Sequence, residues 1–386
     1  MAVNLTNADS ALKTAYLDVV TQQLNTKNPF YAAIKNTTED VYGKEVRKLV
    51  IHGINGGIGA GTEEGALPKA AGANYKNFVT TLKNLYGVIE ISDKAVRASE
   101  SNAGAFVSLL NAEMQSLVDA GIYNFSRMLY GDGSGFLSYL TTHTDNVINV
   151  TDIENLLEGM IVEIRAETTD ELLESNLRIV NVDEVAGTIT VDRSNLNFEP
   201  GSRLCIQGSY MNEITGLGAI FNDSVEEIYG LKKSENTWLK PYSMSKGEIT
   251  ELDIQRAIDE IEKKGGKAPN IILCSWGVRR KLQSILSQNR HSVDMVELAG
   301  GYKAMTYNGI PIVADRFCPK GEMYLLNTED FALHQLCDWQ WLEGDDGKVL
   351  KQIPGKPVYT ATLVKYVDMI CSKPYAQGRI NFISEV

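Results

Sequence analysis

The residue types that most often do chemistry are present in this chain, but their spacing does not build a familiar metal site. The four histidines fall in four separate segments, and none lies three or four residues from another histidine. A zinc site on a helix needs two ligands at that spacing, so no metal ion is predicted. These histidines are His52, His143, His291 and His334.

Three glycines crowd together after a predicted strand, as they do in loops that bind the phosphates of a dinucleotide. Such a loop needs a helix N-terminus directly after the glycines and no competing negative charge. Here two glutamates follow, and Pro68 interrupts any helix, so no cofactor is predicted. The glycines are Gly57, Gly59 and Gly61, and the glutamates are Glu63 and Glu64.

Patterns for nucleophilic and phosphoryl-transfer chemistry are incomplete as well. The segment from Gly131 to Gly135 places its serine one position too late for a Gly-x-Ser-x-Gly elbow. Gly266-Lys267 is followed by Ala268, which has no hydroxyl group for a magnesium ion. The chain is therefore predicted not to be an enzyme.

Two tryptophans could in principle stack on a sugar ring. Trp339 and Trp341 lie two residues apart and would share one face of a strand with Cys337. The same spacing is typical of a buried sheet face, which we favour. A ligand-binding or carbohydrate-active protein stays as a less favoured alternative.

The glycine loop is better explained as an arm. Seven glycines lie between Gly53 and Gly72, and the flanking segments 47–52 and 77–91 have the composition of strands. Hairpins in compact domains close in about two to five residues, and longer unstructured loops are usually functional. We expect this loop to contact another molecule. The candidate contact residues are Gly57, Gly59, Gly61, Glu63, Glu64, Lys69 and Lys76.

Longer segments indicate elements that would position this arm. Apolar residues at spacings of three and four predict a helix over 103–130. Short strands separated by Asp, Asn, Gly and Pro follow between 160 and 210 and predict a small inserted barrel. Helices over 250–262 and 276–286 flank a strand at 270–274, and the last eighty residues are mostly strands. Shorter helices are expected at 11–24 and 93–99.

Composition and charge narrow the function further. The 386 residues are 44% hydrophobic, and no window has the length and hydropathy of a membrane span. Residues 151–230 hold sixteen acidic residues against four arginines, which accounts for the net charge of −12. Because duplex recognition needs clustered Lys and Arg, nucleic acid is not expected as a specific ligand. The N-terminus lacks signal-peptide features, so assembly in the cytoplasm is expected.

The order of these elements resembles that of tailed-bacteriophage major capsid proteins, which share the Hong Kong ninety-seven fold with encapsulins. The resemblance covers nearly the whole chain. Four local stretches are also similar to phage capsid sequences: 212–217, Asn-Glu-Ile-Thr-Gly-Leu; 307–313, Tyr-Asn-Gly-Ile-Pro-Ile-Val; 319–324, Pro-Lys-Gly-Glu-Met-Tyr; and 374–376, Pro-Tyr-Ala.

The resemblance implies an α+β fold with a long spine helix, an extension-loop hairpin, peripheral and axial domains and an inserted all-β barrel. The implied parts are an N-terminal arm 1–50, an extension loop 51–90, a peripheral domain 91–150 with the spine helix 103–130, an acidic barrel 151–210, an axial domain 211–305, and return strands 306–386. The late strands would pair with the hairpin stem and pack on the long helix.

The implied function is that of a structural subunit that assembles with itself into hexamers and pentamers around packaged double-stranded DNA. The first fifty residues leave no room for a long scaffolding region, so a separate scaffolding protein is implied. A portal, non-specific contact with the packaged DNA and a decoration protein on the acidic barrel are further expected partners, and the virion is the expected location. The alternative is the shell of an encapsulin-like cellular compartment.

Overall fold

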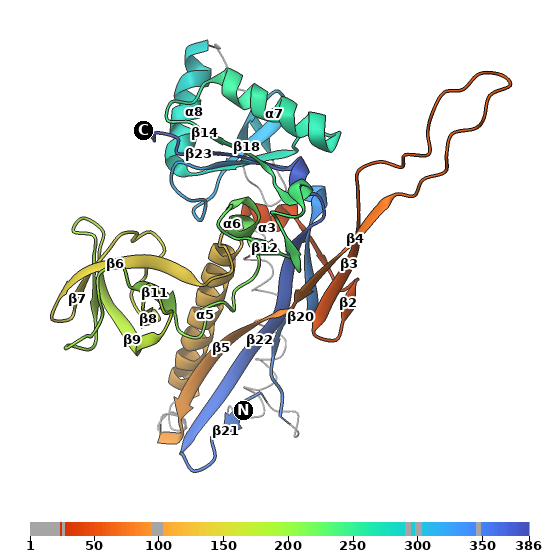
Figure 1. Ribbon diagram of the computed structural model, residues 1–386. Coiled ribbons are helices and arrows are strands. Elements are labelled where there is room, and N and C mark those ends of the chain that lie inside the picture. The colour runs from red at the N-terminus through yellow and green to blue at the C-terminus, as the bar shows by residue number, and fades with distance from the viewer. Residues whose placement is uncertain are drawn as a thin grey trace. The chain divides into compact units, whose positions relative to one another are not determined.

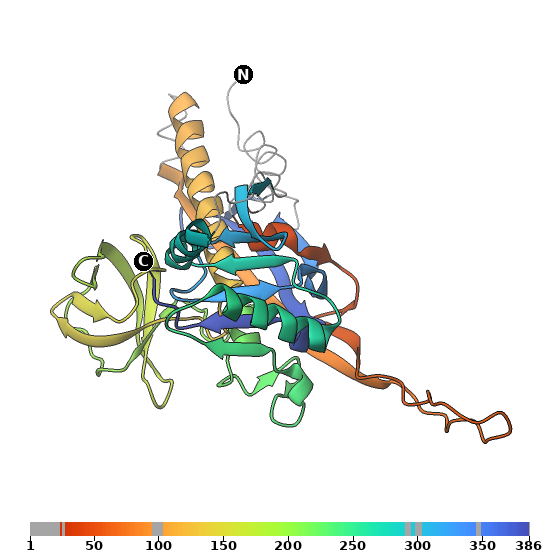
Figure 2. The ribbon, with the colours of Figure 1, turned by 90° about the horizontal axis from the view of Figure 1, so that it is seen from above.

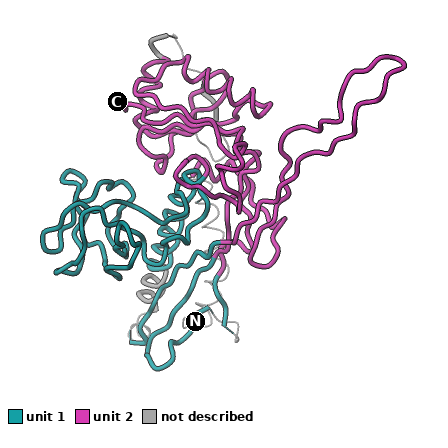
Figure 3. The backbone as a smooth tube through the Cα atoms, viewed as in Figure 1, with its two compact units in different colours: residues 1–24, 83–219, 341–364 teal, residues 25–82, 220–340, 365–386 magenta. Residues whose placement is uncertain are grey.

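The computed structural model describes residues 24, 28–94, 103–289, 295–297, 303–344 and 349–385. The chain forms two compact units, which Figure 3 shows in teal and magenta. Unit 1 comprises residues 1–24, 83–219 and 341–364, and unit 2 comprises residues 25–82, 220–340 and 365–386. Each unit is thus built from segments that are distant in the sequence. The helix expected at 11–24 and most of the one at 93–99 lie outside the described residues.

The long helix of unit 1 is α5, Ala103–Met128. Its 26 residues correspond to a length of about 39 Å at 1.5 Å per residue. Met114, Val118, Ile122 and Phe125 follow each other at helical spacing and are almost fully buried. Strand β5 (Lys83–Ser92) contacts this helix, and a Cβ atom at Gly87 would lie 3.0 Å from Leu117 Cδ1.

Unit 1 also contains a closed barrel of six strands (Figure 1). Its strand order is β10-β7-β6-β11-β8-β9, and alternating Leu, Ile and Val side chains form its core. The sequence placed the start of the barrel at 151, but its first two strands precede that position. The strands are β6 Phe136–Thr144, β7 Val147–Val150, β8 Ile161–Arg165, β9 Leu172–Asp183, β10 Thr188–Val191 and β11 Arg203–Ile206.

The described part of unit 2 contains a sheet of seven strands in the order β14-β23-β19-β15-β18-β17-β16. Helices α7 (Glu251–Gly265) and α8 (Trp276–Asn289) pack on this sheet in one apolar core. A capping box at Thr250 starts α7, and Gly266, with φ of 74°, ends it. The strands are β14 Tyr242–Ser245, β15 Ile271–Cys274, β16 Met295–Glu297, β17 Lys303–Tyr307, β18 Ile310–Ala314, β19 Met323–Leu326 and β23 Gly378–Asn381.

The late strands pair with only part of the segment that the sequence assigned to the hairpin stem. β22 (Val358–Cys371) pairs with β5 and β21 (Lys351–Gln352), and β20 (Phe331–Trp341) pairs with β1 (Lys35–Thr37). β5 overlaps the segment 77–91 that the sequence assigned to the stem, so this part of the expectation is confirmed. In the described chain, the paired strands 45–52 and 74–81 belong to a separate sheet that contains no late strand. The predicted strand 77–91 breaks at Leu82, so its first half stays with the stem and its second half becomes β5.

Short elements complete the described chain. The helical ones are α3 Pro29–Ala33, α6 Leu217–Phe221, η1 Thr237–Leu239, η2 Thr328–Asp330 and η3 Pro374–Ala376. The remaining strands are β2 Val41–Tyr42, β3 Glu45–His52, β4 Asn74–Thr81, β12 Glu227–Ile228 and β13 Leu231–Lys232.

Candidate functional site

Unit 2 carries a hairpin arm, residues 45–81, made of β3, β4 and the loop between them. The two strands pair in register from Glu45 opposite Thr81 to His52 opposite Asn74. Beyond that pair, residues 53–73 form no strand, and Figures 1 and 2 show them extending from the stem as a narrow loop. The arm expected from the glycines is therefore present as an extended structure.

The two faces of the stem differ in burial. On the inner face Val46, Val50 and Phe78 are buried. The outer face carries four exposed apolar side chains beside the polar residues Arg47 and Asn77, and such exposure is unusual for apolar side chains of this size. The apolar residues are Leu49 (60% exposed), Ile51 (54%), Tyr75 (55%) and Val79 (37%). This face was not predicted from the sequence. Its signal was the presence of apolar residues on both faces of each strand.

The loop adds three more exposed apolar residues to the arm. Ile54, Ile58 and Leu67 expose between 85% and 90% of their surface. A Cβ atom at Gly59 would lie 3.2 Å from Pro68 Cγ, so glycine lets the two sides of the loop approach closely. The arm thus presents apolar side chains along its whole length.

The predicted contact residues all lie on this arm. Gly57 is half-buried, and its backbone N–H donates to Asn55 Oδ1 at 2.8 Å. The others are exposed: Gly61, Glu63, Glu64 and Lys69 in the loop with Gly59, and Lys76 on β4. These residues lie at separate points along the arm, and they are not gathered around a cavity.

A buried ion pair anchors the end of α5 in unit 1. Arg127, in the last turn, donates to the carboxylate of Glu213, and both side chains are almost fully buried. The following residues continue the contact, because Leu217 N–H donates to Leu129 O at 2.8 Å. A Cβ atom at Gly216 would lie 2.4 Å from Met128 O, so only glycine fits this approach. These contacts give the 212–217 stretch a structural role that the sequence did not reveal.

The described histidine and tryptophan residues that were considered for chemistry make packing and hydrogen-bond contacts in the fold. Burial lowers the pKa of His334, whose Nδ1 lies 2.9 Å from Glu39 O. His334 is three residues from Cys337, but residues three apart on a strand face opposite sides. The side chains of Trp339 and Trp341 are buried and do not form an open platform. His291 lies outside the described residues.

Nucleophiles and metal ligands show no catalytic arrangement in the described residues. Burial raises the pKa of Cys205 and Cys274 to about 12, which keeps these thiols protonated and unreactive. No three His, Cys, Asp or Glu side chains of the described segments are grouped to hold a metal ion. Within the same segments, no helix has the length and apolar character of a membrane span.

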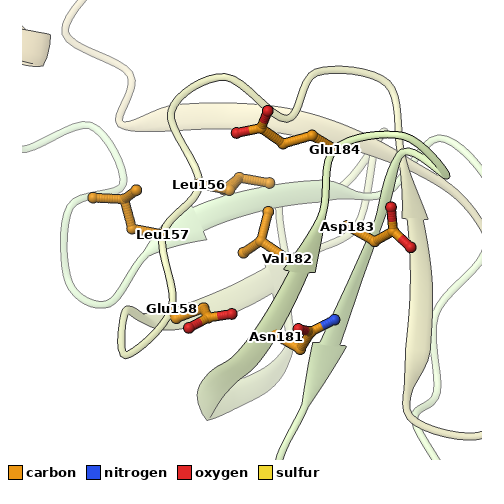
Figure 4. Close-up of a pocket in the computed structure, with 7 residues that line it drawn as sticks. All are labelled: Leu156, Leu157, Glu158, Asn181, Val182, Asp183 and Glu184. Carbon is orange, nitrogen blue, oxygen red and sulfur yellow. The ribbon is translucent and has the colours of Figure 1, made fainter.

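A shallow hollow of about 680 Å³ lies on the barrel of unit 1. Figure 4 shows Leu156 and Val182 at its centre with three carboxylates around them. The charge of this hollow follows the acidic composition of the whole barrel. The lining residues are Leu156, Leu157, Glu158, Asn181, Val182, Asp183 and Glu184.

A family model and several solved structures of capsids are similar to this chain. Residues 207–346 match the family model described as SU10 major capsid protein. The capsid asymmetric unit of cyanophage A-1(L) is 12% identical, with a TM-score of 0.58 over 93% of this chain and 94% of that one. The capsid of a native GTA particle is 10% identical, with a TM-score of 0.50 over 93% and 90%.

An encapsulin is also among the similar structures. The holo-SrpI encapsulin complex of Synechococcus elongatus PCC 7942 is 11% identical, with a TM-score of 0.48 over 94% of this chain and 90% of that one. A search of curated protein sequences returned no match. The likeness to the cyanophage and GTA structures establishes the fold.

Proposed function

Because the chain belongs to the tailed-bacteriophage major capsid proteins and is a structural subunit of the virion shell, we propose that its hairpin arm binds a neighbouring copy. It has the Hong Kong ninety-seven fold, and it is a structural protein and not an enzyme. Self-assembly into a shell follows from the family. The contact between the arm and a neighbouring copy is the part of this assembly that the geometry of this chain supports.

The outer face of the stem is the observation that supports this proposal. Leu49, Ile51, Tyr75 and Val79 leave apolar surface in water on a thin two-stranded hairpin. Burying such a side chain fully contributes roughly 1.5–3 kcal/mol, so a partner that covers the face gains substantially. In a closed shell every subunit makes the same contact, and modest contacts together give a stable assembly.

The loop would extend the same contact. We infer that Gly57, Gly59 and Gly61 keep the loop narrow, and that Glu63, Glu64, Lys69 and Lys76 form polar contacts at the rim of the interface. The division into arm 1–50, extension loop 51–90, peripheral domain, barrel, axial domain 211–305 and return strands 306–386 stays part of this proposal. The boundary between the peripheral domain and the barrel moves from residue 151 to residue 136, where β6 begins.

The further partners are also proposals. Hexamers and pentamers would share this contact, with a separate scaffolding protein, a portal and non-specifically bound double-stranded DNA. The barrel segment from 151 to 210 has twelve acidic residues against four arginines, so a decoration protein that binds it would present a basic surface.

The test is assembly of a variant in which the outer face carries a charge. Ile51→Asp should leave the subunit folded, because the side chain is exposed, and should reduce the yield of shells at least about tenfold. Negative-stain electron microscopy of the chain expressed with its neighbouring genes measures this yield.

Val180→Asp is the matched control, since Val180 is equally β-branched and exposed but lies on β9 of the barrel. Wild-type shell yield from both Ile51→Asp and Tyr75→Asp would contradict the arm contact. Wild-type chain that stays monomeric would contradict the assembly itself. DNA in the shells would favour a phage capsid, and an enclosed enzyme would favour an encapsulin-like compartment.

A further inference from the structure

The stem of the hairpin arm is held by stacked aromatic rings within unit 2, at the end where the loop begins. The indole ring of Trp238, in η1, is nearly parallel to the rings of His52 and Phe78. The ring centroids are 4.6 Å and 5.7 Å from that of Trp238, with interplanar angles of 4° and 3°. His52 is the last residue of β3 and Phe78 lies in β4, so one indole contacts both strands.

A tight turn adds a second support beside the indole. Tyr229 and Gly230 join β12 to β13 with φ of 53° and 74°, the two positive values that a type I′ hairpin turn requires. A tyrosine in this conformation is strained, so surrounding contacts must hold it. Tyr229 O accepts from Val79 N–H at 3.0 Å, and its ring lies 4.9 Å from that of Phe78.

Strand β22 makes one hydrogen bond with the turn at Tyr229 and one with the stem of the arm. The phenol oxygen of Tyr229 accepts from Cys371 N–H at 3.0 Å. Thr80 Oγ1 of the stem donates to Asp368 Oδ2 at 2.5 Å. We call the three supporting residues Trp238, Tyr229 and Asp368 the root clasp.

We propose that the root clasp, and Trp238 above all, sets the direction in which the hairpin arm leaves the subunit. This inference rests on the proposed arm contact. A two-stranded hairpin is marginal by itself, and the loop beyond His52 has no strand pairing, so the loop takes its direction from the end of the stem that the clasp holds. The side chains of the clasp contact His52, Phe78 and Thr80 of the inner face, and Tyr229 reaches Val79 only through the backbone. The exposed side chains Leu49, Ile51 and Tyr75 of the outer face stay available to a neighbouring copy.

The positioning role can be measured in the free subunit. Trp238→Ala should raise amide hydrogen exchange in 45–52 and 74–81 about tenfold, because both stacked pairs are lost. Exchange in β15 and β19 should stay unchanged. The same variant should form fewer or misshapen shells under electron microscopy, and Trp238→Phe should restore part of both properties.

Trp276→Ala is the matched control, since Trp276 is an exposed tryptophan of the same unit on α8. It should change neither readout. Should Trp238→Ala be insoluble, His52→Ala removes one stacked pair and should give a smaller rise in stem exchange.

Unchanged stem exchange in Trp238→Ala or His52→Ala would overturn the clasp, whatever happens to assembly. Faster stem exchange with wild-type shells would overturn its positioning role. Wild-type chain that forms no shells would instead contradict the proposed function, which keeps the two failures distinguishable.

Discussion

At the scale of single residues, the buried pair Arg127–Glu213 is the strongest constraint on the end of the spine helix. Both side chains are removed from water, so each depends on the other for charge compensation. The pairing explains how a glutamate can be buried beside the apolar residues Ile214 and Leu217. Its effect is structural, since no reacting group lies there.

Removing one partner should be costly. Glu213→Leu leaves the guanidinium buried without a counter-charge and should lower the free energy of unfolding by about 3–5 kcal/mol. Urea denaturation followed by circular dichroism measures this change. The double variant Arg127→Met with Glu213→Leu should recover most of the loss, and a single variant within 1 kcal/mol of wild type, on the order of a surface substitution, would contradict the argument.

Lys233 gives a pH-dependent prediction. Its buried Nζ donates to Ile220 O at 3.1 Å and Asn222 O at 2.7 Å, and burial lowers its pKa from 10.5 to about 8. Between pH 8 and 10.5 the unfolded chain therefore binds more protons at this site than the folded chain. The contribution of Lys233 to stability should rise with pH across this window and be constant below it.

The measurement compares wild type with Lys233→Met by denaturant unfolding at several pH values. The difference in free energy of unfolding, wild type minus variant, should increase from pH 8 to pH 10. Lys232→Met, at an exposed neighbouring position on β13, is the control for the loss of a lysine from this segment. A flat difference for Lys233→Met would refute the shifted pKa.

At the scale of elements, glycines decide how closely segments approach. Gly216→Ala places a Cβ atom 2.4 Å from Met128 O and Gly131 O, and these backbone atoms cannot move without disturbing α5. The variant should lose at least about 2 kcal/mol of unfolding free energy. Gly72→Ala, with nothing within 4 Å, should be close to neutral. Thermal unfolding of the two variants side by side tests this, and equal melting temperatures would be the contrary result.

At the scale of the whole molecule, the barrel is an insertion with its own core. Its entry and exit lie together, because Met211 N–H donates to Ser134 O at 2.8 Å. A chain in which a short Gly-Ser linker replaces residues 135–210 should therefore still fold. The excised barrel should also unfold cooperatively alone.

Circular dichroism and size-exclusion chromatography of both pieces check this prediction. An equally long deletion that crosses α5 is the negative control, because it removes the buried stripe of the spine helix. Aggregation of the barrel-deleted chain in the same way as this control would show that the barrel is required for folding.

The sequence by itself determined the elements whose signals are local. Apolar spacing of three and four predicted α5, and the helices expected over 250–262 and 276–286 are present as α7 and α8. The order of these elements carried the resemblance to the family. The seven glycines predicted a projecting loop, because a segment so rich in glycine disfavours both helix and strand formation.

Only the tertiary structure decided which strands pair and which surfaces stay in water. Alternation of side chains with a period of two defines the two faces of a strand, but it does not show which strand pairs with it. The pattern at 77–91 therefore did not reveal the break at Leu82 or the pairing of β5 with β22. The barrel likewise gained β6 and β7 through pairing across the chain. The stack of His52 and Phe78 on Trp238 joins residues more than 150 positions apart, and such contacts depend on packing that no local pattern encodes.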